Sequence, residues 1–162
     1  GGMPILFNVF NNHYGMGGQT KGETMAYGDL ARLGCIAQNQ MNAERINGWN
    51  PLAVIDAYKR KRQLLEEGKG PVLLDVVTYR LSGHSTSDAM SYRTKDEVEE
   101  WTKLDPLTVF PQQIVDAKVA TQEEIDAVRD AVIDRNQRMF MLASDLEISL
   151  SKSSKSDSEK AP

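Results

Sequence analysis

The 162-residue sequence contains a single cysteine, Cys35, and only two histidines. One cysteine excludes a disulfide framework within the chain and is the usage expected in a reducing cytoplasm. No apolar run approaches the roughly 20 residues that span a bilayer. The first residues also have neither the charged nor the apolar segment of a signal peptide. We therefore expect a cytoplasmic protein with no membrane partner.

The sequence also has no excess of positive charge: its formal net charge is -4. A chain of that charge is not expected to bind nucleic acid in general. The content of 40% hydrophobic and 26% charged residues is that of an ordinary globular protein. At this length the chain can form one domain with a core of moderate size.

The amino-terminal region joins an apolar run to a polar, glycine-containing loop. Residues 4–10 predict a strand buried on both faces, and Asn11, Asn12, His13 and Tyr14 follow it directly. In open parallel sheets, ligands lie outside the carboxyl ends of the strands. Amide and carbonyl oxygens are hard ligands that suit Mg²⁺. The pattern predicts a cation and phosphate site, and an ordinary Asn/Gly turn is the alternative.

The middle of the chain predicts two helices. Residues 29–39 suggest a short helix with Asp29 as its N-cap, and a short strand and turn follow at 44–50. Asn50 and Pro51 then fit the cap and the first position of a helix over about 51–67. Its apolar face is expected to include Leu52, Ile55, Tyr58 and Leu65.

Residues 71–79 form the clearest strand, because they are nearly all apolar or β-branched, as in a central parallel strand. Two strands joined by a helix predict a parallel crossover unit and an α/β fold. The first strand begins within a few residues of position 1, whereas a parallel strand needs neighbours on both sides. We therefore expect the chain to begin in the middle of a sheet.

The second strand is followed by a long polar loop, 79–93, which contains His84. Loops at strand ends often carry function, and histidine titrates near neutrality. The alternative is a serine-rich surface loop with a hydrogen-bonded histidine. Two polar loops after two parallel strands favour a site at one sheet edge.

The carboxyl-terminal region predicts helices. Capping boxes are expected at Thr94–Glu97 and Thr121–Glu124, a short helix begins at Asp105-Pro106, and the longest helix spans about 121–144. The polar tail 151–162 is expected to be disordered.

With both loops identified, the sequence resembles a known family. Asn11–Gly17, Tyr79–Asp88 and Ser91–Thr94 are similar to motifs in the alpha subunit of the thiamine-diphosphate-dependent 2-oxo acid dehydrogenases. The similarity covers about residues 3–145. It implies that residues 1–150 are the C-terminal part of a parallel-sheet thiamine-diphosphate-binding domain, ending in a helical segment.

The resemblance also implies roles for particular residues. Asn12 and the main-chain carbonyl of Tyr14 would hold Mg²⁺ on the diphosphate, and Gly15 would let the loop wrap the cation. His84 would lie near the cofactor and assist acyl transfer to a lipoyl group. Ser85 matches a position that mitochondrial members phosphorylate. Arg80 and Arg93 match family residues that hold the second loop in place.

Further partners are implied because the family's Gly-Asp-Gly segment, which supplies another Mg²⁺ ligand, does not occur in this sequence. We expect the chain to need the N-terminal half of the alpha subunit, a beta subunit and a lipoyl-bearing acyltransferase, in a hetero-oligomer. The second loop is most similar to that of pyruvate dehydrogenases, and acetoin and branched-chain 2-oxo acid dehydrogenases are the alternatives. Ser82 departs from the usual pattern.

A different class of function also remains open. The chain could be an inactive fragment that serves as an interaction module. Its partners would then bind an exposed sheet edge and surfaces around Trp49, Trp101 and Met139–Met141.

Overall fold

The computed structural model describes residues 3–16, 18–23, 25, 28–36 and 41–145. Two compact units make up the chain, a sheet unit of residues 1–110 and a helical unit of residues 111–162. The predicted tail at 151–162 lies outside the described residues. Within the described part of the chain, no helix has the length and apolar character needed to cross a membrane.

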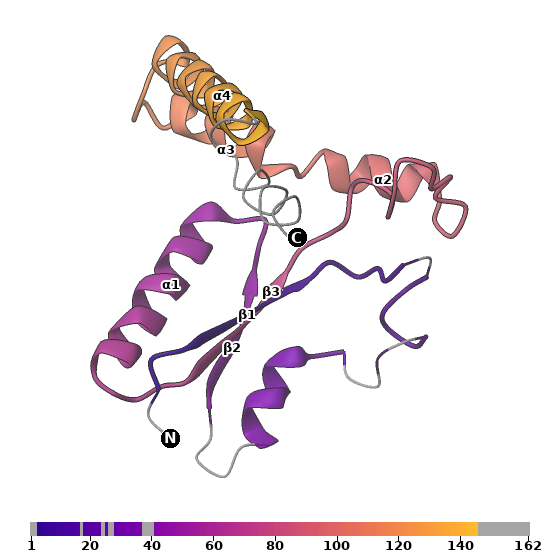
Figure 1. The fold of residues 1–162 in the computed structure, drawn as a ribbon, viewed down its shortest axis with the longest axis vertical. Helices are drawn as coiled ribbons and strands as arrows, with labels where there is room; N and C mark the ends of the chain where they lie inside the picture. Colours follow the sequence, from indigo (N-terminus) through magenta and orange to yellow (C-terminus); the bar gives the residue numbers. More distant parts are fainter. Residues whose placement is uncertain (1–2, 17, 24, 26–27, 37–40, 146–162) are drawn as a thin grey trace, which may run out of the picture. The chain divides into compact units, whose positions relative to one another are not determined.

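The sheet unit contains three parallel strands, β1 (Leu6–Asn11), β2 (Asn42–Asn47) and β3 (Val72–Val77). Their order is β1-β3-β2, so β3 is central (Figure 1). Leu6 and Asn42 both pair with Val72, and all three strands end in register at Val77. This arrangement confirms the α/β class with a parallel sheet.

The core is built on β3, which is buried from Val72 to Val76. Leu74 and Val76 pack with Ile46 of β2 and Ala57 of the following helix. The continuous apolar run therefore predicted the central strand correctly. The prediction that β1 is buried on both faces is wrong, because Phe7 is 46% and Phe10 66% exposed. β1 pairs only with β3 among the described strands, so its other side is not covered by a neighbour.

Helix α1 (Pro51–Glu66) begins as predicted, since the Asn50 side chain accepts the N–H groups of Leu52 and Ala53 at 3.1 and 3.2 Å. Gly68, with φ of +70°, follows its end. A glycine adopts this left-handed conformation without strain. The predicted pair Arg62–Glu66 forms at 2.8 Å.

The buried face of α1 differs from the prediction. Leu52 is 62% and Ile55 49% exposed, while Ala57 and Lys61 are buried. The inward stripe is Val54, Ala57, Tyr58 and Lys61, which has the spacing i, i+3, i+4, i+7. A lysine can occupy that stripe because its stem packs while its ammonium lies 3.2 Å from Glu44 of β2.

The segment predicted as a helix over 29–39 is a 3-10 helix, η1 (Leu30–Ile36). It contacts β2 and β3, as α1 does, and Figure 1 shows η1 and α1 on opposite sides of the strands. The Leu30 N–H, at the first position of η1, donates to Asp75 Oδ2 at 2.9 Å. The predicted N-cap is wrong because, in the described part of the chain, no amide that follows Asp29 donates to its side chain. Asp29 Oδ1 has no hydrogen-bond partner among the described residues. Residues 37–39 lie outside the described residues.

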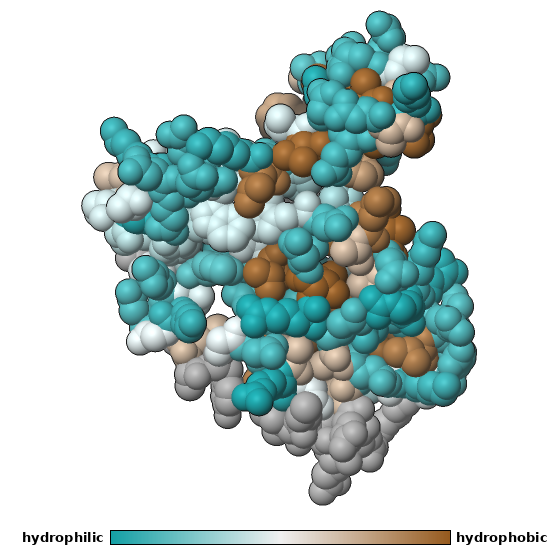
Figure 2. Space-filling view, turned by 180° about the vertical axis from the view of Figure 1, so that it is seen from behind, coloured by the Kyte–Doolittle hydropathy of each residue, from teal (hydrophilic) through white to brown (hydrophobic). Residues whose placement is uncertain are grey.

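Three further helices follow, α2 (Lys95–Thr102), α3 (Pro106–Asp116) and α4 (Gln122–Ser144). The capping box that begins α4 forms as predicted. None of the side chains of α4 is buried, and its exposed apolar residues include Val128, Val132, Met139, Phe140 and Leu142. On the face of the molecule shown in Figure 2, brown hydrophobic patches lie between the hydrophilic residues.

Candidate functional site

Both polar loops begin side by side at the carboxyl ends of β1 and β3. Beyond Asn11 and Val77, the last paired residues of β1 and β3, two more backbone hydrogen bonds join the two segments. The Thr78 N–H donates to the Asn11 carbonyl at 2.9 Å, and the Arg80 N–H donates to the Asn12 carbonyl at 3.2 Å. The prediction that the two loops share one sheet edge is therefore confirmed. Segments 66 residues apart, beginning at Asn12 and Thr78, leave the sheet as neighbours.

The first loop turns sharply at His13, whose φ is +70°. The turn brings the Asn12 side-chain oxygen to 3.3 Å from the Tyr14 N–H. Tyr14 then forms an antiparallel bridge with Gln19, in which the hydrogen bonds are Gly15 N–H to the Gly18 carbonyl and Thr20 N–H to the His13 carbonyl. In such a pair the polar groups of the central residue point away from the partner strand. The Tyr14 carbonyl is thus left outside the bridge.

The donor set of this turn suits a hard cation. Asn12 Oδ1 and the Tyr14 carbonyl are neutral oxygens, the type that Mg²⁺ accepts together with phosphate oxygens and water. The described residues contain no group of three or more His, Cys, Asp or Glu that could enclose a metal. Asn12 Oδ1 and the Tyr14 carbonyl are thus the oxygens of this turn whose chemistry fits the predicted cation.

Gly15 adjoins this turn without close contacts of its own. A Cβ built there would meet only the Gly18 carbonyl oxygen, at 3.9 Å. The Gly15 carbonyl accepts a hydrogen bond from Arg80 Nη1 at 3.1 Å. Its observed contribution is this backbone contact to the second loop.

The Tyr14 side chain is held by a residue for which the sequence suggested another role. Glu97 Oε1 accepts from the Tyr14 hydroxyl at 2.5 Å and from the Tyr79 hydroxyl at 2.9 Å. Burial and then the hydrogen bond to Glu97 raise the pKa of the Tyr14 phenol, and the same causes raise that of Tyr79. Both phenols are therefore protonated at neutral pH.

The capping box predicted at Thr94 is only half formed as a result. The Thr94 hydroxyl oxygen accepts the Glu97 N–H at 3.2 Å, as predicted. The Glu97 carboxylate points instead to the two phenols. The prediction that it caps Thr94 in return is wrong, because two hydroxyl donors compete with one backbone N–H.

An aromatic cluster surrounds the same loops. Trp101 of α2 stacks on Tyr79 at 4.9 Å and on Trp49 at 5.3 Å between ring centroids, and His13 meets its edge at 5.9 Å. The four residues come from separate segments of the chain, so no local pattern predicts that their rings meet. The cluster joins α2 to the ends of all three strands.

Two arginines hold the second loop, as the resemblance implied. Arg93 donates to the carbonyls of Arg80 and Leu81, and its guanidinium carbon lies 5.3 and 5.4 Å from the ring centroids of Tyr14 and Tyr79. Arg80 Nη1 lies 3.1 Å from the Gly15 carbonyl and 3.4 Å from His84 Nδ1. Arg80 thus connects the Asn12–Gly15 turn to the predicted histidine.

The exposed part of the second loop is organised by Asp88. Its carboxylate accepts the His84 N–H at 2.7 Å, the Tyr92 hydroxyl at 2.8 Å and the Met90 N–H at 2.8 Å. The backbone bonds from His84 and Met90 lower the pKa of Asp88 to about 2. His84 and Ser85 are both exposed, and Ser85 Oγ lies 3.1 Å from Ser87 Oγ.

The pKa of Asp88 leads to a prediction about acid. Because the folded pKa is below the ordinary value, the carboxylate stabilises the loop fully above about pH 4 and loses this effect as the pH falls through about 2. The His84 amide should therefore lose its protection from hydrogen exchange in that interval, and in Asp88→Ala at any pH. Exchange measured by NMR from pH 5 to 2 is the test. Unchanged His84 protection in Asp88→Ala would contradict it.

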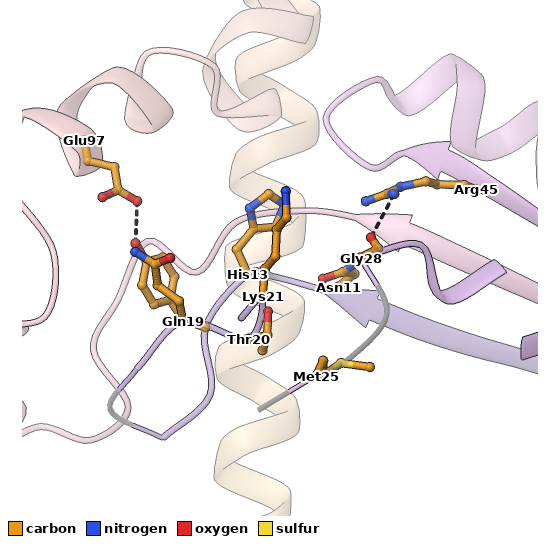
Figure 3. Close-up of a pocket in the computed structure, with 10 residues that line it drawn as sticks. Asn11, His13, Gln19, Thr20, Lys21, Met25, Gly28, Arg45 and Glu97 are labelled. Carbon is orange, nitrogen blue, oxygen red and sulfur yellow. Dashed lines mark hydrogen bonds between the residues drawn. The ribbon is translucent and has the colours of Figure 1, made fainter. Parts of the chain in front are cut away.

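A polar pocket of about 340 Å³ lies beside the first loop (Figure 3). Its lining includes Tyr14 but neither Asn12 nor His84, so the sequence-predicted residues do not all meet in one cavity. Burial, and then Arg45, lower the pKa of His13 in its wall. Arg45 itself donates to the Gly28 carbonyl at 3.0 Å. The lining is Asn11, His13, Tyr14, Gln19, Thr20, Lys21, Met25, Gly28, Arg45 and Glu97.

The chain is similar to known proteins over most of its length. Residues 1–145 match the family model described as the dehydrogenase E1 component. The chain belongs to this family. The relatives described next are each named as a pyruvate dehydrogenase E1 component subunit alpha, so the resemblance to the alpha subunit is confirmed.

The relatives differ in source. The protein of Rickettsia conorii is 32% identical over 131 residues, which are 81% of this chain and 39% of that protein. The probable mitochondrial subunit of Caenorhabditis elegans is 36% identical over 128 residues, covering 78% of this chain and 31% of that protein. The human testis-specific mitochondrial form is 36% identical over 128 residues, covering 78% and 32%. The chain thus spans about a third of the length of these E1 component relatives.

Proposed function

We propose that the chain supplies part of a Mg²⁺–thiamine diphosphate site in the decarboxylating component of a 2-oxo acid dehydrogenase. The observation that carries the proposal is the adjacency of two loops at one sheet edge. The Asn12–Gly15 turn and the His84 loop are joined there by Arg80, which contacts the Gly15 carbonyl and His84 Nδ1. Membership in the E1 component family supports it.

Asn12 Oδ1 and the Tyr14 carbonyl would hold Mg²⁺ at the diphosphate end of the cofactor. When bound, thiamine diphosphate supplies the electron sink for loss of CO₂ from a 2-oxo acid. The residues that hold the metal would thereby orient the diphosphate, because a bound metal acts as a template. The contribution of these residues is therefore to place the cofactor, and the hydrogen bond from Arg80 to Gly15 keeps the turn that bears them in register with the second loop.

His84 is proposed to assist transfer of the acyl unit to a lipoyl group. Arginine has no hydrogen-bond acceptor, so Nδ1 of His84 accepts from Arg80 when they bond, and the ring proton resides on Nε2. The exposed ring can then offer that N–H to a group arriving from solvent. A phosphate on the neighbouring Ser85 would add negative charge beside Asp88, to which the loop is bonded, and would oppose its order.

Pyruvate is the proposed substrate, because the similar relatives are named pyruvate dehydrogenase subunits. A beta subunit, a lipoyl-bearing acyltransferase and a chain carrying the Gly-Asp-Gly segment are the proposed partners. The last of these would provide the remaining protein ligand to Mg²⁺. Acetoin and branched-chain 2-oxo acids are the alternative substrates.

The test is calorimetric titration of Mg²⁺ and thiamine diphosphate into the chain mixed with the beta subunit and an alpha-subunit segment containing Gly-Asp-Gly. We expect binding in the mixture and a loss of at least about tenfold in Asn12→Ala, because one metal ligand is removed. Asn42→Ala is the matched control, since Asn42 is an exposed amide at the start of β2.

Equal binding by the wild type and Asn12→Ala would contradict the ligand assignment. Absence of binding in the complete mixture would contradict the proposed function and favour an interaction module.

A further inference from the structure

Glu97 lies outside both loops and forms a hydrogen bond to the predicted metal-binding turn through the Tyr14 hydroxyl. We propose that Glu97 is a positioning residue, which holds Tyr14 so that the Tyr14 carbonyl and the Asn12 side-chain oxygen face a common cation. This inference rests on the proposed function for the identity of the cation.

The geometry gives Glu97 a direct hold on the turn. Its Oε1 lies 2.5 Å from the Tyr14 hydroxyl and 2.9 Å from the Tyr79 hydroxyl, so one oxygen joins the turn after β1 to the segment after β3 (Figure 3 shows Glu97 above the loop). Hydrogen bonds to a carboxylate are shorter and stronger than neutral ones. A tyrosine ring fixed at its hydroxyl restrains its own backbone, because only two side-chain torsions separate them.

Glu97 lies in the first turn of α2, and its backbone is fixed there by a hydrogen bond. Its N–H is bonded by the Thr94 cap at 3.2 Å, and Trp101, one turn later on the same helix, stacks on Tyr79. Positions i and i+4 of a helix lie on one face, so Glu97 and Trp101 form a continuous surface against the loops. Both side chains by which α2 contacts the loops are therefore positioned by one helix.

Within the described part of the chain, the Glu97 carboxylate makes its hydrogen bonds to the two phenols and not to a cationic side chain. Among the described residues it has no ion-pair partner, although it is only partly exposed. The guanidinium carbon of Arg93 lies 5.3 and 5.4 Å from the ring centroids of Tyr14 and Tyr79, and no ion pair between Arg93 and Glu97 occurs in the described ranges. A neutral apolar side chain would fill the same place between α2 and the aromatic cluster, so the carboxylate is suited to orienting hydroxyl groups rather than to packing.

The first test measures amide hydrogen exchange in the full chain without added ligand. In Glu97→Ala the amides of Gly15 and Thr20, which close the Tyr14 bridge, should exchange about tenfold faster, because a charge-assisted bond is lost. Glu97→Gln keeps an acceptor oxygen and should restore most of the protection. Asp96→Ala is the matched control, because it removes an exposed carboxylate from the same turn of α2.

Exchange of the β3 amides separates positioning from a merely structural role. The proposal requires that Val76 stay protected in Glu97→Ala while Gly15 loses protection. Equal acceleration at both sites, or none at Gly15, would overturn it. In a Tyr14→Phe background, Glu97→Ala should have little further effect on Gly15, since the hydroxyl through which it acts is gone.

The second test titrates Mg²⁺ and thiamine diphosphate into the reconstituted mixture described above. Glu97→Ala should weaken binding about tenfold, and Glu97→Gln much less. Unchanged affinity in Glu97→Ala overturns the positioning role. Failure of the wild type to bind contradicts the proposed function instead, and the exchange rates still decide whether Glu97 holds the turn.

Discussion

Replacing Leu74 with alanine is expected to lower the free energy of unfolding of the sheet unit by about 3 kcal/mol. Leu74 is fully buried on the central strand and packs with Ile46, Ala57 and Val76. Because β3 is hydrogen-bonded to a strand on each side, the backbone cannot move inward to fill the cavity. The loss therefore includes both the buried methyl groups and the cavity left behind.

Chemical denaturation followed by tryptophan fluorescence measures this change, because both tryptophans, Trp49 and Trp101, lie in the sheet unit. Leu52→Ala is the matched control: the same change is made on α1, where the side chain is 62% exposed. It should cost less than about 0.5 kcal/mol. Similar losses in the two variants would contradict the assignment of the core to β3.

Asp75→Ala is expected to have the next largest effect, about 2 kcal/mol, because it leaves a buried N–H without an acceptor. Asp75 is fully buried, and its Oδ2 accepts the Leu30 N–H at 2.9 Å. Arg45 Nε lies 3.7 Å from the same oxygen, so Asp75→Ala removes an ion-pair contact as well as the hydrogen bond. The substitution should loosen η1 and the pocket wall formed by Gly28 and Arg45.

Asp75→Asn distinguishes the hydrogen bond from the charge. The amide oxygen can still accept the Leu30 N–H, so the loss in unfolding free energy should be under about 1 kcal/mol. Asp56→Ala, an exposed carboxylate paired with Arg60 at 2.9 Å on α1, is the control for loss of a surface ion pair. If Asp75→Asn lowered the free energy of unfolding as much as Asp75→Ala does, the charge of Asp75, and not its acceptor oxygen, would hold η1.

Local signals in the sequence predicted the elements whose causes are local. Asn50 and Pro51 set the start of α1, and Thr121 and Glu124 set the start of α4, because a cap needs only neighbouring residues. The continuous apolar run from Val72 predicted β3. Two polar loops after two parallel strands predicted that Asn12 and His84 follow one sheet edge, and the strand register brings those loops together.

Residues whose partners are distant were missed or misassigned. Asp75 interrupts an apolar run, yet its role depends on Leu30, 45 positions earlier. Glu97 fitted a capping box, but the hydroxyl of Tyr14, 83 positions away, takes its carboxylate. The face of α1 shifted because Lys61 can reach Glu44 on β2. In each case a tertiary contact outweighs a local preference that is worth about 1 kcal/mol or less.

The shared register of β1 and β3 constrains how this chain can vary in length. Side chains alternate along a strand, so one residue inserted within Leu6–Asn11 would exchange the places of Asn11 and Asn12 at the sheet edge. An insertion between Gly48 and Gly70 leaves that alignment intact, because α1 lies outside the ladder. Divergence among members of the family is thus expected to add residues to the connections while keeping the residue count within the strands fixed.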